Sequence, residues 1–140
     1  MKIKEIMHEA TMVKCPMSIL DITKLMSEKN VGSVLTEKDG CVMVVTERDI
    51  LNKVVALDKD SKKTKVSDIM TKCVHTIDSN SDVFEASDIF NKYQIRRLPV
   101  MERGKVIGMV TARDVAKSLV YLGLRAGITK RSRYVRGEYR

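Results

Sequence analysis

The same phrase occurs twice in this chain, and the duplication constrains its fold more than any other feature. V-V-T-E-R-D-I occupies residues 44–50 and M-V-T-A-R-D-V occupies residues 109–115, so their threonines lie 65 positions apart. Three further segments recur in the same order at offsets of 63 or 64: I-K-E-I-M as V-S-D-I-M, S-I-L-D-I-T-K-L-M as D-V-F-E-A-S-D-I-F, and V-G-S-V-L as I-R-R-L-P. Self-similarity at a fixed spacing indicates a repeated supersecondary unit. We therefore predict two copies, residues 1–60 and 61–122, followed by a basic tail, residues 123–140.

Each copy shows the same succession of secondary-structure patterns. Apolar residues at helical spacing follow Ser18 in the first copy and Asp82 in the second, and such a polar residue is typical of a helix start. Two short β-type segments come next, joined by turns that contain Gly40 and Gly104. A second helix begins at each T-x-R-D phrase, and we predict that these apolar side chains face inward: Ile50, Leu51, Val54, Val55, Val115, Leu119, Val120 and Leu122.

A short apolar lead-in before each first helix adds a possible strand to this pattern. The pattern then predicts an α/β (α+β) protein made of two repeats of helix, strand, strand and helix, each with that possible strand ahead of it.

The T-x-R-D phrase admits two interpretations. A threonine that begins a helix, with an acid three residues later, forms a capping box for unpaired N–H groups, which would explain Thr46 with Asp49 and Thr111 with Asp114. The same helix start also suits phosphate, and an aspartate one turn in can accept hydrogen bonds from a ribose diol. Gly108 would remove a side chain where a flat base approaches the backbone. The second interpretation points to an adenosine nucleotide.

Composition predicts a globular protein without membrane contact. Hydrophobic residues make up 44% of the chain and charged residues 31%, which is unlike a disordered chain. No apolar run approaches the ~20 residues that span a bilayer. The opening M-K-I-K-E-I-M-H-E mixes acids with bases and lacks a long apolar region, unlike a secretory signal. We expect a cytoplasmic location.

Metal binding and catalysis find little support in the sequence. Cys15, Cys41 and Cys73 are far apart, and only His8 and His75 could help to complete a zinc site. We find no triad-like nucleophile and base, no P-loop and no metal motif. Both histidines lie near the starts of the repeats, where we expect packing or exposure rather than chemistry. The prediction is a protein that is not an enzyme.

The net charge of +8 is concentrated at the C-terminal end. Residues 117–140 hold seven basic residues and one acid, which leaves +2 for the first 116 residues. Arginines there alternate with Tyr134 and Tyr139, a composition compatible with phosphate contact and base stacking. The alternative is a solvated tail that aids solubility or binds an acidic partner. No nucleic-acid-binding motif accompanies the tail.

The duplicated unit, with G-M-V-T-A-R-D and the preceding I-R-R-L-P-V, closely resembles a tandem pair of CBS domains, the regulatory modules named after cystathionine β-synthase. The resemblance covers residues 1 to about 122. It implies two β-α-β-β-α units that pack through their sheets with pseudo-two-fold symmetry, and two related clefts between them. Family members commonly bind AMP, ADP, ATP or S-adenosylmethionine in such clefts and commonly dimerise.

The resemblance also implies roles for single residues. Asp49 and Asp114 would hold ribose hydroxyls, and Thr46 and Thr111 would contact phosphate or ribose.

A basic pair ahead of L-P-V binds phosphate in some family members, and it falls on Arg96 and Arg97. Arginine forks suit that task. The first copy departs from this pattern, because Gly32–Ser33 replaces the basic pair and Met43 stands in the place of Gly108. We therefore expect two unequal clefts.

The leading hypothesis is a stand-alone regulatory module, an energy sensor that binds AMP, ADP or ATP as its ligand. It would need no cofactor, form a homodimer and act in trans through a protein target. The rival is a nucleic-acid-associated accessory protein that uses its basic tail, with the CBS pair as a scaffold.

Overall fold

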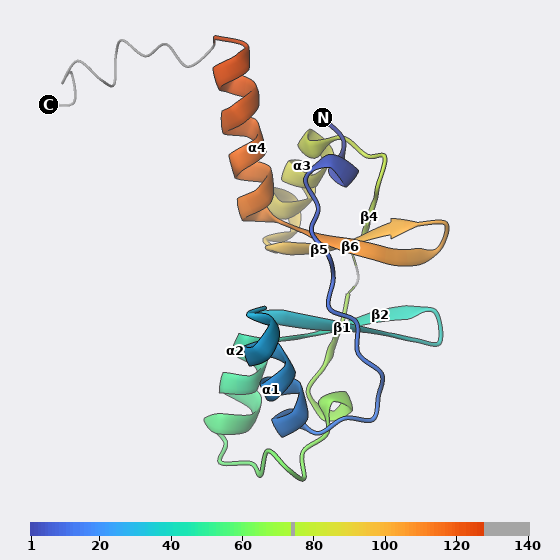
Figure 1. Ribbon diagram of the computed structural model, residues 1–140, viewed down its shortest axis with the longest axis vertical. Coiled ribbons are helices and arrows are strands. Elements are labelled where there is room, and N and C mark those ends of the chain that lie inside the picture. Colours follow the sequence, from blue (N-terminus) through green and yellow to red (C-terminus); the bar gives the residue numbers. More distant parts are fainter. Residues whose placement is uncertain (74, 128–140) are drawn as a thin grey trace, which may run out of the picture.

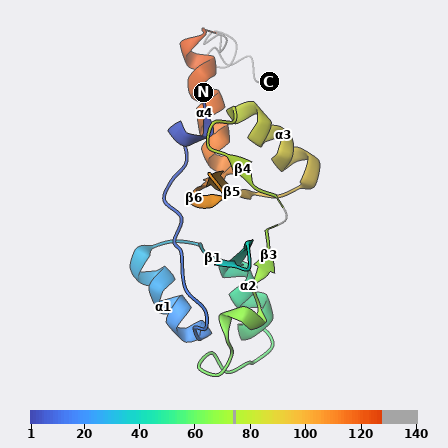
Figure 2. The same cartoon turned by 90° about the vertical axis from the view of Figure 1, so that its right-hand side faces the viewer.

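The structure, a computed structural model, describes residues 1–73 and 75–127. Two lobes are stacked along the long axis of the molecule, each with a three-stranded sheet and helices on the outer side of that sheet (Figure 1). The two sheets face each other at the middle of the molecule, and the view turned by 90° shows the same arrangement (Figure 2). The predicted mixed α and β fold with two repeated units is confirmed.

Both lobes contain helix, strand, strand and helix in that order. The first lobe consists of α1 (Ile19–Lys29), β1 (Ser33–Lys38), β2 (Cys41–Thr46), α2 (Glu47–Ile50) and the π-helical segment η2 (Leu51–Val55). The second lobe consists of β4 (Ile77–Asp78), α3 (Val83–Tyr93), β5 (Arg97–Glu102), β6 (Lys105–Thr111) and α4 (Ala112–Arg125). The lead-in segments hold the 3-10 turns η1 (Ile3–Glu5) and η3 (Val66–Asp68) and the strand β3 (Thr71–Lys72).

The predicted helix starts and strand pairs are present. Ser18 and Asp82 cap α1 and α3 by accepting backbone N–H groups. β1 pairs antiparallel with β2, and β5 pairs antiparallel with β6. The lead-in of the second copy does add a strand, because β4 runs parallel to β5.

The lead-in segments also cross between the lobes. β3 belongs to the lead-in of the second repeat in sequence, yet it pairs antiparallel with β2 of the first lobe. Reciprocally, the N-terminal segment pairs with β6: the His8 N–H donates to the Met109 carbonyl at 3.0 Å, and the Met109 N–H donates to the His8 carbonyl at 2.9 Å. Each sheet therefore gains an edge from the other copy.

The hydrophobic core of each lobe also contains a residue from the lead-in segment of the other copy. Ile3 is fully buried among Val83 and other residues of the second lobe, and Val66 is buried among residues of the first lobe. Between the sheets, Leu35 and Met109 belong to a third buried cluster that joins the lobes. The predicted boundaries at residues 60 and 122 therefore describe sequence repeats, whereas each folded core draws on both copies.

The second helix of each lobe buries fewer side chains than the pattern predicts. Val54 and Val115 are buried, but Leu51, Val55 and Val120 are 57%, 64% and 59% exposed, so the prediction that these three face inward is wrong. In the first lobe the helix changes from α to π at Leu51, which alters the angle between successive side chains. In α4, Val120 lies about 140° around the helix axis from Val115, at 3.6 residues per turn.

The C-terminal helix is longer than predicted. α4 continues to Arg125, so residues 123–125 of the predicted tail are helical. The basic stretch with Tyr134 and Tyr139 falls within residues 128–140, outside the described residues. In the described part of the chain, no helix has both the length and the apolar character needed to cross a bilayer.

Candidate functional site

Both T-x-R-D phrases begin helices through a complete capping box. The Thr46 hydroxyl accepts the Asp49 N–H at 3.3 Å, and Asp49 Oδ2 accepts the Thr46 N–H at 2.9 Å. Thr111 and Asp114 make the same pair of bonds at 3.1 and 2.9 Å. The capping interpretation is confirmed for both phrases. It leaves the second oxygen of each carboxylate for another contact.

A cavity of about 270 Å³ lies beside the start of α4 and is termed the Asp114 cleft. Its walls are residues 8–11, residues 30–33, Leu35, Arg97, Met109 and Thr111. Asp114 lies next to this lining, because its Oδ2 is 3.2 Å from His8 Nδ1 and bonds to the Thr111 N–H. The cleft thus combines the second T-x-R-D with segments of the first lobe.

A second cavity, of about 220 Å³, is termed the Asp49 cleft because Thr46, the partner of Asp49, lines it. The other lining residues are Val44, Cys73, Ile95, Arg96, Arg97, Pro99 and Met109. Most of them are sequence counterparts, at offsets of 63 to 65, of residues that line the Asp114 cleft. The clefts are therefore related by the pseudo-two-fold symmetry of the repeats.

Each cleft combines the T-x-R-D phrase of one lobe with the start of the first hairpin strand of the other lobe. These strand starts are residues 30–33 in the Asp114 cleft and residues 95–97 in the Asp49 cleft. Arg96 lines the Asp49 cleft, whereas Arg97 lines both clefts. Arg97 reaches the first lobe, since its Nη2 lies 3.5 Å from where a Cβ on Gly32 would stand. The structure thus brings Arg97 together with Thr111 and does not place Arg96 in that cleft.

Gly108 is buried beneath the N-terminal segment. A Cβ built there would lie 2.8 Å from the Met7 sulfur and 2.9 Å from the His8 carbonyl oxygen. A backbone oxygen cannot move aside without disturbing the pairing of His8 with Met109. The close approach that requires this glycine is therefore between two parts of the chain itself.

His8 was not expected at the site. The sequence suggested packing or exposure, and the side chain is indeed about half exposed, but its Nδ1 faces the Asp114 carboxylate at 3.2 Å. The crossing of the N-terminal segment onto β6 places it there. The available signal was the alignment of I-K-E-I-M with V-S-D-I-M, which makes His8 the counterpart of Thr71.

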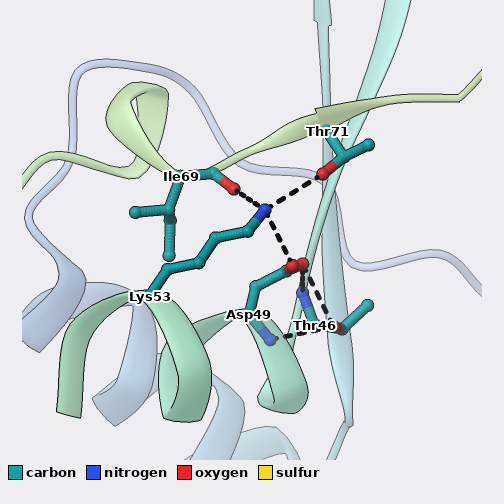
Figure 3. Close-up of polar contacts among 5 residues, drawn as sticks. All are labelled: Thr46, Asp49, Lys53, Ile69 and Thr71. Carbon is teal, nitrogen blue, oxygen red and sulfur yellow. Dashed lines mark hydrogen bonds and ion pairs between the residues drawn. The ribbon is translucent and has the colours of Figure 1, made fainter. Parts of the chain in front are cut away.

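Lys53 is the second residue that the sequence did not indicate. Its ammonium lies 3.1 Å from Asp49 Oδ1 and donates to the Ile69 carbonyl at 3.0 Å and to the Thr71 hydroxyl at 3.3 Å (Figure 3). The counterpart of Lys53 in α4 is Ser118, whose hydroxyl instead donates to the Asp114 carbonyl oxygen at 2.8 Å.

These contacts affect the titration of Asp49. Burial raises the pKa of its carboxyl, but hydrogen bonds from Thr46 and from the Lys53 ammonium outweigh burial and hold the pKa below its ordinary value. In the lining of the Asp49 cleft, burial raises the pKa of the Cys73 thiol to about 11. That thiol stays protonated at neutral pH and is a poor nucleophile.

Within residues 1–73 and 75–127, no group of three or more His, Cys, Asp or Glu side chains could hold a metal ion. The lining of the two clefts contains hydrogen-bonding groups, among them Thr111 and Arg97 in one and Thr46 and Arg96 in the other.

Comparison with known proteins identifies relatives of this chain. A model of the CBS domain matches residues 3–56 and 66–121. The CBS domain-containing protein CBSX3, mitochondrial, of Arabidopsis thaliana is 32% identical over 128 residues, which cover 87% of this chain and 62% of that protein. The chain therefore spans less than two thirds of that relative's length.

Solved structures share the fold. A hexameric CBS-CP12 protein from bloom-forming cyanobacteria superposes with a TM-score of 0.77 at 26% identity, covering 87% of this chain and 74% of the other. A CBS domain pair in complex with 5′-methylthioadenosine and S-adenosyl-L-methionine gives a TM-score of 0.74 at 23% identity, covering 87% and 98%. At 23% identity, the similarity to this second structure shows a shared fold and no more.

Proposed function

This chain belongs to the CBS domain family, and from that premise we propose that it is a stand-alone regulatory module that binds an adenosine nucleotide of the AMP, ADP or ATP class. The ligand occupies the Asp114 cleft, and a partner protein in trans responds to its binding. The observation that carries the proposal is the convergence of Thr111, His8 and Arg97 on one cavity, with Asp114 directly beside it.

The polar groups of the Asp114 cleft match the parts of a nucleotide. Asp114 Oδ2 accepts the Thr111 N–H, and no hydrogen bond or ion pair from a described residue engages its other oxygen, Oδ1. That oxygen is suited to a ribose diol. Thr111 begins a helix of 14 residues, whose first N–H groups and positive dipole end favour phosphate. Arg97, exposed at the cleft, adds a cation for the phosphates.

The remaining walls suit a purine base. Val31, Leu35 and Met109 contribute apolar surface to the cleft. The cavity of about 270 Å³ lies near the lower end of the range for small-molecule pockets, about 300 to 1,000 Å³. A mononucleotide fits this size better than a dinucleotide. The related fold in complex with two adenosine derivatives supports the choice of base.

The proposal includes a homodimer. Exposed apolar side chains lie on the second helix of each lobe: Leu51 and Val55 on η2, and Val120, Tyr121 and Leu124 on α4. Covering such patches is favourable, about 25 cal/mol for each Å² of apolar surface removed from water. A hexameric neighbour of the same fold supports self-association. Light scattering that shows only monomers at micromolar concentration would contradict the dimer.

Regulation without catalysis and a cytoplasmic location belong to the same proposal. The relative in Arabidopsis carries a mitochondrial label, so fractionation of the native cell is the measurement for the compartment. The nucleic-acid alternative depends on residues 128–140, which lie outside the described residues, and no observation in the described part favours it.

Titration calorimetry of the full chain tests the proposed function. ATP, ADP, AMP, adenosine and S-adenosylmethionine form the panel, and GTP is the control because it differs in the base alone. We expect binding of the adenosine nucleotides and weaker binding of GTP. An absence of binding by every member of the panel would overturn the proposal.

A further inference from the structure

The Asp49 carboxylate is occupied by the protein itself. Its Oδ2 accepts both the N–H and the hydroxyl of Thr46, at 2.9 and 3.1 Å, and its Oδ1 faces the Lys53 ammonium at 3.1 Å. The Asp49 side chain is 18% exposed. Both carboxylate oxygens therefore have partners at the positions where a ribose diol would have to bond.

Lys53 is held in this position from three sides. An ammonium group has three donors, and Lys53 directs them at Asp49 Oδ1, the Ile69 carbonyl and the Thr71 hydroxyl (Figure 3). Ile69 and Thr71 belong to the lead-in segment that crosses from the second copy, so the lysine also joins η2 to β3. A ligand would have to displace a cation that has three partners.

The other lobe offers no equivalent cation at that position in the helix. Ser118 replaces Lys53, and its hydroxyl turns back to the Asp114 carbonyl oxygen at 2.8 Å. The Nδ1 atom of His8 lies next to Oδ2 of Asp114, the oxygen that also accepts the Thr111 N–H. Among the described residues, no hydrogen bond or ion pair engages Asp114 Oδ1.

The helices that carry the two aspartates differ as well. α4 runs for 14 residues, whereas α2 ends after four and changes to the π-helical segment that carries Lys53. The two helices therefore differ in their geometry beyond the first turn as well as in the residue that follows the aspartate by one turn, Lys53 or Ser118.

We propose that Lys53 is an internal plug that closes the Asp49 cleft to a ribose diol, so that each chain binds one adenosine nucleotide although it has two T-x-R-D phrases. This inference rests on the proposed function of the Asp114 cleft. Lys53 acts by occupying the carboxylate, and the fraction of molecules in which it is displaced limits the apparent affinity of the second cleft.

Titration calorimetry of the full chain with ATP tests the plug through stoichiometry. We expect wild type to bind one ATP per chain and Lys53→Ser, which copies Ser118, to bind two. Lys53→Arg keeps a cation and should stay at one. Adding Asp49→Ala to Lys53→Ser should return the stoichiometry to one, which assigns the new site to the Asp49 cleft.

A wild type that binds two ATP per chain would overturn this inference alone, and so would a folded Lys53→Ser that still binds one. A wild type that binds none while Lys53→Ser binds one would support the plug and overturn the proposed Asp114 site. Absence of binding by both would overturn both. If Lys53→Ser loses its cooperative melting transition, Lys53→Gln removes the charge with a side chain of similar length and replaces it in each comparison.

Discussion

The Asp49 and Asp114 clefts start from the same four-residue T-x-R-D pattern and differ in what surrounds it. In both, a threonine and an aspartate complete a capping box with nearly equal bond lengths. In one, Lys53 binds the second carboxylate oxygen, and in the other His8 approaches the oxygen that the cap already uses. The duplicated motif therefore forms two similar helix starts, and the neighbouring residues determine which carboxylate oxygens have partners among the described residues.

The neighbours that differ come from two sources. Lys53 lies one helical turn after Asp49, within the same element. His8 and Thr71 arrive from the crossing lead-in segments, far from their aspartates in sequence. A comparison of the two clefts is thus also a comparison of what the exchanged segments contribute.

The largest expected effect concerns the lead-in segments that cross between the lobes. Ile3→Ala should lower the free energy of unfolding by about 2–5 kcal/mol, because truncating a fully buried isoleucine leaves a cavity. Urea denaturation at neutral pH measures the change. Val66→Ala, at the corresponding position in the other lobe, should destabilise less because fewer atoms are removed. A loss below about 0.5 kcal/mol for Ile3→Ala would mean that the N-terminal segment does not belong to the second core.

The next effect compares the two aspartates. Asp114→Ala should weaken ATP binding by about ten- to a hundredfold, because a hydrogen bond to a charged group contributes about 1.5–3 kcal/mol. Asp49→Ala removes an equivalent cap, so both variants should lose a similar stability, about 0.5–2 kcal/mol. Calorimetry measures the affinity for ATP, and thermal melting measures the stability of each variant. Equal affinities of the two variants for ATP would contradict the assignment of the ligand to the Asp114 cleft.

A smaller effect compares the two arginines. Arg97→Ala should weaken ATP binding by up to about fivefold, because an exposed ion pair contributes about 0.2–1 kcal/mol, and should leave adenosine binding unchanged. Arg96 lines the Asp49 cleft alone, so Arg96→Ala is the matched control and should bind ATP as wild type does. Calorimetry with ATP and adenosine measures both. Loss of adenosine affinity in Arg97→Ala would point to a general disturbance of the fold rather than a phosphate contact.

The smallest effect appears at acid pH. The folded pKa of Asp49 lies below the value of 3.8 for an unperturbed aspartate, so its contribution to stability is present above that unfolded value and is lost as pH falls through the folded pKa. Melting temperatures recorded from about pH 6 to pH 2 should therefore fall less steeply in Asp49→Asn than in wild type. Lys53→Ser should lie between them, since it removes one cause of the lowered pKa. The same pH dependence of the melting temperature in all three proteins would contradict this account of Asp49.

Several features of the fold could be predicted from sequence because they depend on neighbouring residues. The capping boxes need a threonine and an aspartate three positions apart, and the hairpin turns need Gly40 and Gly104, both of which have positive φ angles. The repeat itself is a comparison of the chain with its own sequence. The burial of whole helix faces was predicted less well, since the change to a π-helix at Leu51 has no local signal in the apolar pattern.

The composition of the clefts was decided by the tertiary structure. Sequence alone determined that two T-x-R-D helix starts exist and that Gly32–Ser33 stands where the second copy has Arg96 and Arg97. Only the folded chain shows that each cleft combines one lobe's helix start with the other lobe's strand start. Residues 30–33 of the first lobe line the Asp114 cleft together with Thr111, and Arg96 of the second lobe lines the Asp49 cleft together with Thr46. The physical reason is the sequence separation of the interacting residues. A helix cap is completed within one helical turn, so a local pattern predicts it. A cleft between lobes depends on strand pairing between segments tens of residues apart, and no local pattern predicts that pairing.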